Sequence, residues 1–197
     1  MLAVIGGSGL TQLASLELVE RQRRRTPYGE PSAALSFGRI SGCPVVFLAR
    51  HGDDHGIPPH QVNYRANIWA LRECGPVGIV AVAAVGSIRA NLCPGDLVMP
   101  DQIIDYTWGR ESTYHEGPER AVRHVDFTEP FDRRLRQRLA RAAAAIGIDL
   151  AHSAVYAATQ GPRLETAAEI NRLERDGADV VGMTAMPEAV LARELGV

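Results

Sequence analysis

The sequence predicts an α/β fold, a single domain with a central mixed β-sheet flanked by helices. Short apolar runs bounded by Gly, Pro or Asp alternate with segments whose apolar residues recur at helical spacing. The chain has 197 residues, a length that suits one domain with a sizeable core. The sequence shows no repeat, low-complexity segment or linker, so residues 1–197 are expected to form one domain.

The expected strands share a high content of β-branched and other apolar residues. They are Leu2–Ile5, Ala34–Ile40, Pro44–Arg50, Ile79–Val85, Leu97–Asp105, Val155–Thr159 and Ala178–Thr184. Ser41-Gly42 separates the second and third runs, which is typical of a hairpin. The fourth run is apolar throughout, which predicts a strand buried on both faces.

The expected helices combine helical periodicity with a start or stop signal. They are Gln61–Cys74, Phe131–Ile146, Thr166–Asp176 and Pro187–Leu195. Gly75-Pro76 ends the first. The second follows Thr128-Glu129-Pro130 and has an apolar stripe opposite its arginines. These helices are expected to cover the sheet.

The chain contains no lysine, because all 21 of its basic residues are arginines. Enzymes that form a Schiff base on lysine are therefore excluded, including pyridoxal enzymes and lysine-dependent aldolases. An ordinary P-loop nucleotide hydrolase is excluded as well, since its motif needs a lysine. Any phosphate that this protein binds must be held by arginine, histidine, hydroxyl or backbone N–H groups.

The net charge and the cysteine spacing indicate which partners and which cellular compartment the sequence favours. The 23 acidic residues give a net charge of -2, which argues against a nucleic-acid partner; the basic run 21–25 is interpreted as a solvated edge. The three cysteines have no CxxC spacing, which favours a reducing cytoplasm without a zinc site or disulfides. We expect no signal peptide and no membrane span.

Two segments at the ends of expected strands could hold an anion. Gly6-Gly7-Ser8-Gly9 could present backbone N–H groups and the Ser8 hydroxyl, although a plain tight turn explains the glycines equally well. Arg50 could clamp an oxyanion, and His51 could add a donor. The alternative for these two is a strand-capping arginine and a loop histidine. A metal site at His51–His55 is not favoured, because glycines and prolines make this segment a loop.

Two later segments have simple alternatives as well. In Gly161–Thr166, Arg163 and Glu165 could be a charge pair at a helix start. Thr184 ends an expected strand with a hydroxyl donor, and Met183 alone would more often fill a core. The order of all these segments along the chain carries more information than any one of them.

Taken together, the segments resemble the purine nucleoside phosphorylase and methylthioadenosine phosphorylase family, and within it the bacterial S-methyl-5'-thioinosine phosphorylases. The resemblance runs from residue 4 to the end. The matching segments are Gly6-Gly7-Ser8-Gly9-Leu10, Leu48-Ala49-Arg50-His51-Gly52, Val62-Asn63-Tyr64-Arg65-Ala66-Asn67, Gly86-Ser87 with Pro94-Gly95-Asp96, Gly161-Pro162-Arg163, and Met183-Thr184 with Pro187-Glu188.

The resemblance implies that inorganic phosphate attacks C1' of a purine nucleoside, in purine salvage. It implies a catalytic set of Arg50, His51 and Glu165, with phosphate as co-substrate and no cofactor or metal. The remaining implied phosphate contacts are Ser8, Ala84 and Thr184. The implied nucleoside contacts are Met183, Leu164, Glu165 and His124, the last reaching the site of a neighbouring subunit in a homotrimer.

Glu165 is the specificity clue. A carboxylate can accept the N1–H of a 6-oxopurine, whereas N1 of a 6-aminopurine is itself an acceptor, and such a mismatch costs about 1–3 kcal/mol. By resemblance, the oxopurine enzymes have Glu here and the methylthioadenosine enzymes have Ser. S-methyl-5'-thioinosine is therefore the expected substrate, and inosine or guanosine and methylthioadenosine are the alternatives.

The resemblance also implies a further strand, loop and helix after Leu195-Gly196-Val197. Either the sequence is part of a longer protein, which we favour, or the protein is truncated. In the second case the site lacks its donor to purine N7, and a non-catalytic nucleoside- or phosphate-binding relative is the alternative.

Overall fold

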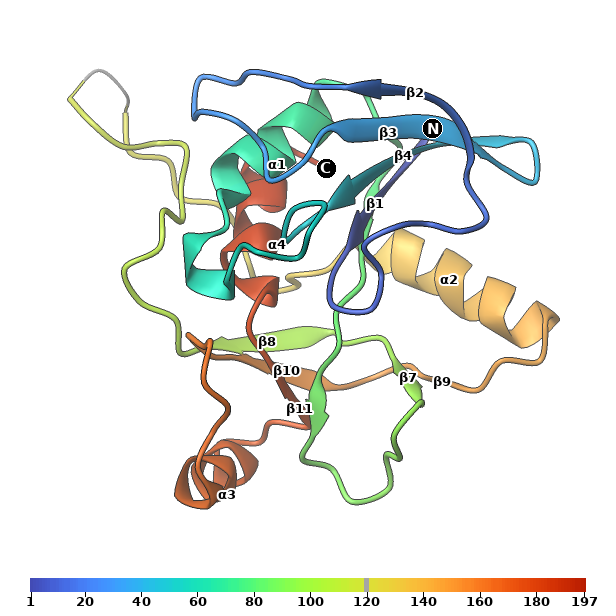
Figure 1. The fold of residues 1–197 in the computed structure, drawn as a ribbon. Coiled ribbons are helices and arrows are strands. Elements are labelled where there is room, and N and C mark those ends of the chain that lie inside the picture. The colour runs from blue at the N-terminus through green and yellow to red at the C-terminus, as the bar shows by residue number, and fades with distance from the viewer. Residues whose placement is uncertain (119–120) are drawn as a thin grey trace.

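The structure is a computed structural model that describes residues 1–118 and 121–197, and it has the predicted α/β architecture (Figure 1). The first sheet has the strand order β2-β3-β4-β1-β5. Its strands are β1 (Leu2–Gly6), β2 (Glu17–Gln22), β3 (Leu35–Ile40), β4 (Cys43–Ala49) and β5 (Ile79–Ala81). The predicted hairpin is confirmed, since β3 and β4 pair antiparallel, while β1 runs parallel to β4 and β5.

The second sheet has the order β6-β11-β10-β8. Its strands are β6 (Gly86–Ser87), β8 (Gln102–Asp105), β10 (Val155–Ala158) and β11 (Val180–Gly182). Because β8, β10 and β11 run parallel, the loops that follow them leave the same edge of the sheet. Two further short strands, β7 (Leu97–Val98) and β9 (Leu150–Ala151), pair with each other.

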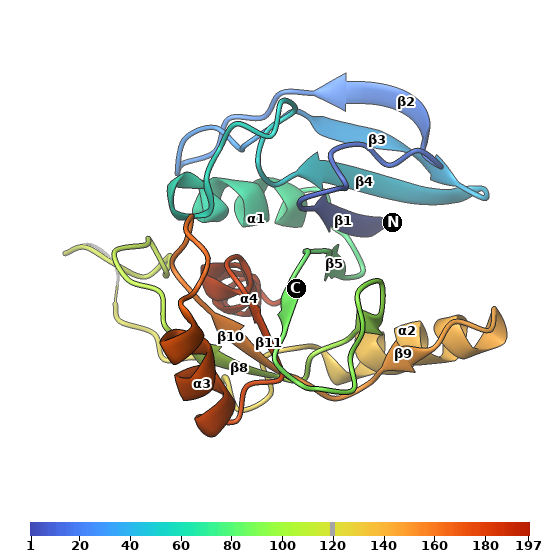
Figure 2. The same cartoon turned by 60° about the horizontal axis from the view of Figure 1, so that its bottom comes forward.

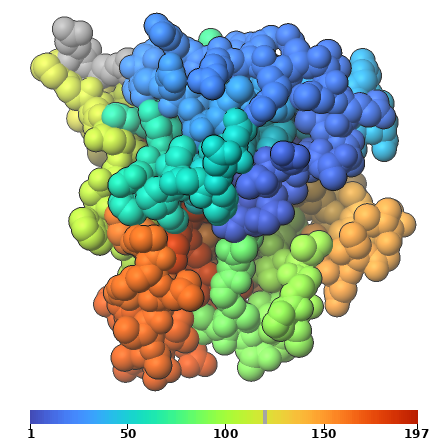
Figure 3. Space-filling model, viewed as in Figure 1, coloured from blue at the N-terminus to red at the C-terminus, as the bar shows by residue number. Residues whose placement is uncertain are grey.

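The described strands thus form separate sheets instead of the one central sheet that the sequence predicts. The predicted strand at Ile79–Val85 ends at Ala81 because the carbonyl of Val82 accepts a hydrogen bond from Arg50 and the chain then lines a cavity. Burial on both faces is wrong for this segment, since Val82 is 43% exposed. Figure 3 shows the N-terminal part, blue to teal, lying above the C-terminal part in orange.

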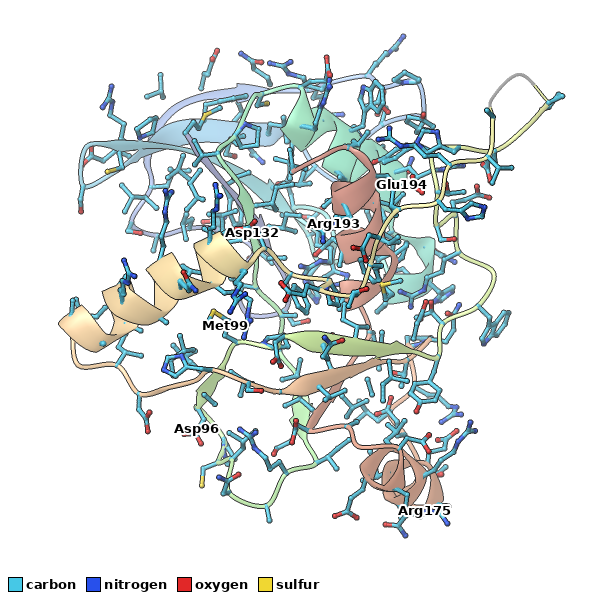
Figure 4. The ribbon with its side chains drawn as sticks, turned by 180° about the vertical axis from the view of Figure 1, so that it is seen from behind. Asp96, Met99, Asp132, Arg175, Arg193 and Glu194 are labelled. Atoms are coloured by element: carbon cyan, nitrogen blue, oxygen red, sulfur yellow. The ribbon has the colours of Figure 1, made fainter. Side chains whose placement is uncertain are left out.

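Three of the four helices of the described chain begin at a side chain that bonds a backbone N–H group of the first turn. The four helices are α1 (Tyr64–Arg72), α2 (Arg133–Ala145), α3 (Ala167–Arg175) and α4 (Ala185–Glu194), with a 3-10 turn at Pro59–Gln61. Asn63, Asp132 and Thr166 each accept an N–H of the first turn of α1, α2 and α3. Asp132 is labelled at the start of α2 in Figure 4.

The largest apolar core lies where α1 and α4 pack against the first sheet (Figure 2). Ile68 and Leu71 of α1 and Leu191 of α4 are fully buried there. At its end, α4 also holds the segment that leads to α2, because Glu194 accepts hydrogen bonds from Thr113 and Tyr114 (Figure 4). In the described part of the chain, no helix has the length and apolar character needed to cross a membrane.

Candidate active site

A cavity of about 720 Å³ is lined by residues that follow strands of both sheets, a size typical of small-molecule sites. One wall comes from the loops after β1, β4 and β5, and the other comes from the loops after β10 and β11. The predicted site residues in its lining are Ser8, Arg50, His51, Ala84, Leu164, Glu165, Met183 and Thr184. The fold thus gathers residues that lie far apart in the sequence.

Arg50 is a buried cation, only 1% exposed, at the end of β4. Its Nε and one terminal nitrogen donate to the two carboxylate oxygens of Glu188 at 2.7 and 2.9 Å, and the other terminal nitrogen donates to Val82 O at 2.9 Å. Burial disfavours its charge, but the Glu188 carboxylate holds the pKa of Arg50 above its ordinary value. Three of the five guanidinium N–H groups are bonded within the described chain, and two remain for an anion in the cavity.

The glycine loop after β1 lies directly against this guanidinium. A Cβ at Gly7 would lie 2.6 Å from a terminal nitrogen of Arg50 and 2.8 Å from Val82 O, so only glycine allows this approach. Ser8 follows, and its hydroxyl lies 3.2 Å from Nε2 of His55. The loop therefore brings a hydroxyl to the cavity beside the buried cation.

His51 is held by its own loop. Nδ1 lies 2.8 Å from the carbonyl oxygen of Ile57, which can only accept, so Nδ1 carries the proton. Burial lowers the pKa of His51, and the charge of Arg50 lowers it further. The ring is thus neutral at pH 7, and Nε2 is an acceptor. The sequence suggests a donor at this place, whereas Nε2 of His51, which lines the cavity, can accept a hydrogen bond from a ligand there.

The opposite wall carries Met183 and Thr184, between β11 and α4. Thr184 is buried, and its side chain makes no capping hydrogen bond to α4, so the hydroxyl is not used by the helix start. The loop after β10 approaches Met183 so closely that a Cβ at Gly161 would lie 2.3 Å from the sulfur. Gly161 also has φ +62°, a conformation that favours glycine.

Glu165 lies in the same loop and is half-buried. The hydroxyl of Thr159 donates to one of its carboxylate oxygens at 2.6 Å. No other described residue donates to the carboxylate, so its second oxygen can accept from a ligand. The adjacent Leu164 is 79% exposed at the mouth of the cavity.

One predicted contact lies elsewhere. His124 is exposed and does not line the cavity of its own chain. Conversely, Glu188 and His55 were not singled out as site residues from the sequence. The bidentate pairing of Glu188 with a residue 138 positions away leaves no local signal. Among residues 1–118 and 121–197, no group of three His, Cys, Asp or Glu side chains is placed to hold a metal ion.

Comparison with known proteins decides the family. The model of the phosphorylase superfamily matches residues 1–197. The chain belongs to the phosphorylase superfamily. This superfamily member is 53% identical over 193 residues to a protein of Pseudomonas syringae named as a probable S-methyl-5'-thioinosine phosphorylase, covering 98% of this chain and 78% of the relative.

Two further relatives support the same assignment. The 6-oxopurine nucleoside phosphorylase of Pyrococcus furiosus is 47% identical, over 98% of this chain and 74% of its own length. The crystal structure of methylthioadenosine phosphorylase from Schistosoma mansoni in complex with tubercidin superimposes with a TM-score of 0.95. It is 37% identical and covers 100% of this chain and 76% of that protein.

Proposed function

We propose that the protein catalyses the phosphorolysis of a purine nucleoside. A phosphate oxygen forms a bond to C1' of the pentose while the bond from C1' to N9 of the purine breaks, and the bonding electrons leave with the base. The departing purine anion takes up one proton and hydrogenphosphate gives up one, so the products are the free purine and a pentose 1-phosphate. The observation that carries this proposal is the buried Arg50–Glu188 pair, which aims a fixed cation at a nucleoside-sized cavity.

The chemistry of the lining supports this reaction. Cleavage of an N-glycosidic bond develops positive charge on the sugar, as in glycoside hydrolysis. Phosphate bound by Arg50, Ser8 and Thr184 places negative charge beside that centre, and His51 accepts the remaining phosphate proton in a hydrogen bond. Positioning and electrostatics supply the catalysis, so phosphate is the co-substrate and no lysine, metal or cofactor takes part.

We assign the base pocket to Glu165. Because Thr159 occupies one carboxylate oxygen, the other is available to accept the N1–H of a 6-oxopurine. The names of the Pseudomonas and Pyrococcus relatives point to the same class of base. We therefore favour S-methyl-5'-thioinosine as the substrate, with hypoxanthine and S-methyl-5-thioribose 1-phosphate as products.

The test is absorbance-monitored turnover of methylthioinosine, inosine and methylthioadenosine, with and without phosphate. Phosphate-dependent release of hypoxanthine from methylthioinosine is expected to be the fastest reaction. Faster turnover of inosine or methylthioadenosine would favour those alternatives, and binding without turnover would favour a non-catalytic relative.

Substitution of Glu165 tests the base assignment directly. Glu165→Ser is expected to lower the ratio of kcat/KM for methylthioinosine over methylthioadenosine by about 10- to 100-fold, since a buried polar match is lost. Glu165→Gln is the matched control, because it keeps the shape and replaces one acceptor oxygen by a donor. An unchanged ratio in both variants would contradict the role of Glu165.

The assembly and the compartment extend this proposal. We infer a homotrimer in which His124 reaches the site of a neighbouring subunit, which accounts for an exposed histidine remote from the cavity of its own chain. Three free cysteines fit a reducing cytoplasm, where purine salvage operates. Sedimentation equilibrium measures the assembly, and His124→Ala should weaken nucleoside binding without changing the mass of the oligomer.

A further inference from the structure

Arg110 links the two loops that carry Glu165 and Met183, the nucleoside wall of the cavity, although Arg110 does not line the cavity itself. It lies in the segment after β8. The loop after the neighbouring β10 leads to Glu165, and the loop after β11 carries Met183 and Thr184. Because the three strands are parallel, all three loops leave the same edge of the sheet, and the side chain of Arg110 reaches both of the others.

The guanidinium of Arg110 is occupied by backbone and amide oxygens. One terminal nitrogen donates to Met183 O and Met186 O at 2.7 and 2.6 Å. The other donates to Gln160 O at 2.9 Å and Thr159 O at 3.3 Å, and Nε donates to the side-chain oxygen of Gln160 at 3.2 Å. The first of these nitrogens also donates to the Tyr64 hydroxyl at 3.4 Å, so acceptors surround all five N–H groups.

This arrangement differs from an ordinary ion pair. None of the ion pairs between described residues includes Arg110. Burial lowers the pKa of Arg110, because removing the guanidinium from water disfavours its charged form. The hydrogen bonds to carbonyl oxygens offset this loss of hydration. The guanidinium carbon Cζ lies over the ring of Tyr64 in α1, 5.6 Å from the ring centre. Both loops are therefore bonded to one planar group.

We propose that Arg110 is a positioning residue that fixes the separation between the base-binding Glu165 and the sugar- and phosphate-binding Met183 and Thr184. This inference rests on the proposed function. Thr159 is bonded both to Glu165 and, through its carbonyl oxygen, to Arg110, so the clamp acts one residue from the base contact. The carbonyl of Met183 precedes Thr184 in the same way. Arg110 thereby sets the distance between the bound purine and the attacking phosphate.

The same two strands supply a matched control at their other end. Arg89 donates to Ser153 O at 2.9 Å, just before β10, and lies 3.6 Å from the carboxylate of Asp179, just before β11. Arg89 therefore joins the amino ends of β10 and β11 as Arg110 joins the loops after their carboxyl ends. Arg89 does not line the cavity. If substitution of either arginine acts only by lowering stability, both variants should lose activity. If the separation of the two loops matters, only substitution of Arg110 should lower activity.

The experiment compares Arg110→Gln with Arg89→Gln. In the first variant, kcat for methylthioinosine is expected to fall by roughly 10²-fold, the effect of displacing reacting groups by about 1 Å. KM for phosphate should change less than kcat, because only Thr184 among the phosphate contacts follows a carbonyl that Arg110 holds, while Ser8, Arg50 and His51 follow strands of the other sheet. Arg89→Gln should keep kcat near the wild-type value. Equal loss of kcat in both variants, in proportion to their unfolding temperatures, would overturn the proposal.

A second variant and a measurement of substrate specificity distinguish loss of the clamp from misfolding. Arg110→Lys keeps the charge but offers three N–H groups in place of a planar five, so it cannot bond both loops at once. We expect it to fold, with a lowered kcat and a lowered ratio of kcat/KM for methylthioinosine over methylthioadenosine. Wild-type kcat and ratio in a folded Arg110→Lys would refute the clamp. If the wild-type protein turns over no nucleoside, the proposed function fails instead.

Discussion

The two walls of the cavity are built in opposite ways. The phosphate wall consists of Ser8, Arg50 and His51 at the ends of β1 and β4, and it rests on the largest apolar core of the described chain. The nucleoside wall consists of Glu165 and Met183 after β10 and β11, with the phosphate contact Thr184 beside Met183, and it rests on two smaller clusters. The first has a buried ion pair at its centre, while the second has a cation bonded only to uncharged oxygens.

This difference suits what each wall has to bind. Phosphate is small and doubly charged, so a buried guanidinium held by a carboxylate provides a fixed, dry site for it. A nucleoside is larger and must enter and leave, and the wall that contacts it includes the exposed Leu164 and the half-buried Glu165. Substitutions that change charge or volume should therefore have their largest effects on the phosphate wall. Substitutions that change the separation of the two loops should have their largest effects on the nucleoside wall.

The largest expected effect comes from removing the countercharge of the phosphate wall. Glu188→Gln leaves Arg50 buried without its partner, and such a broken pair costs about 3–5 kcal/mol of unfolding free energy. Arg50 would also lose its fixed orientation, so KM for phosphate should rise strongly. Urea denaturation and initial-rate kinetics measure the two effects.

A double variant separates charge from packing. Arg50→Met with Glu188→Leu replaces the pair by apolar groups, and we expect it to regain most of the lost stability because no charge stays buried. Activity should be lost, because the guanidinium that binds phosphate is gone. If the double variant were as unstable as Glu188→Gln, the shape of the pair would matter more than its charge.

The next effect tests how closely the glycine loop approaches Arg50. Gly7→Ala places a methyl group 2.6 Å from the guanidinium, and overpacking of this kind costs about 1–3 kcal/mol. The loop must shift, so phosphate binding should weaken. Gly56→Ala is the matched control in the same cavity, since no atom lies within 4 Å of its added Cβ. Equal effects of the two substitutions on the KM for phosphate would contradict a tight contact at Gly7.

The sequence predicts much of the fold because its signals are local. The hairpin at Ser41-Gly42 and the helix that begins after Thr166 both have short-range determinants, and both are present. The strand β2 was missed, since Glu17–Gln22 is charged and almost wholly exposed, as is common at a sheet edge. Ile79–Val85 was overextended, because the bond from Arg50 that ends the strand comes from a distant residue.

The residues of the candidate site also differ in whether a local sequence signal identifies them. Residues that belong to motifs, such as Arg50, His51 and Thr184, could be named from the sequence, and the fold places them around one cavity. Glu188 and Arg110 could not, because what they do depends on partners brought near only by folding. Glu188 lies in a segment that matches the family, but nothing in that segment names Arg50 as its partner, and Arg110 lies in none of the matching segments.

The smallest expected effect concerns the protonation of His51. Its pKa in the folded protein is below that of an ordinary histidine, so at low pH the unfolded chain binds more protons than the folded one. The unfolding free energy should therefore be constant above about pH 6.5 and decrease as the pH falls below it, by about 1.4 kcal/mol for each unit between the two pKa values. The decrease ends below the folded pKa.

His51→Asn is the variant that tests this, because the amide can still donate to the carbonyl of Ile57 but does not titrate. Urea denaturation between about pH 7 and pH 5 should give a steeper loss of stability in the wild type than in the variant. Parallel curves would mean that other groups cause the loss. The nucleoside wall has no histidine among the cavity-lining residues, so the ratio of kcat/KM between the two purine classes should stay constant over the same range.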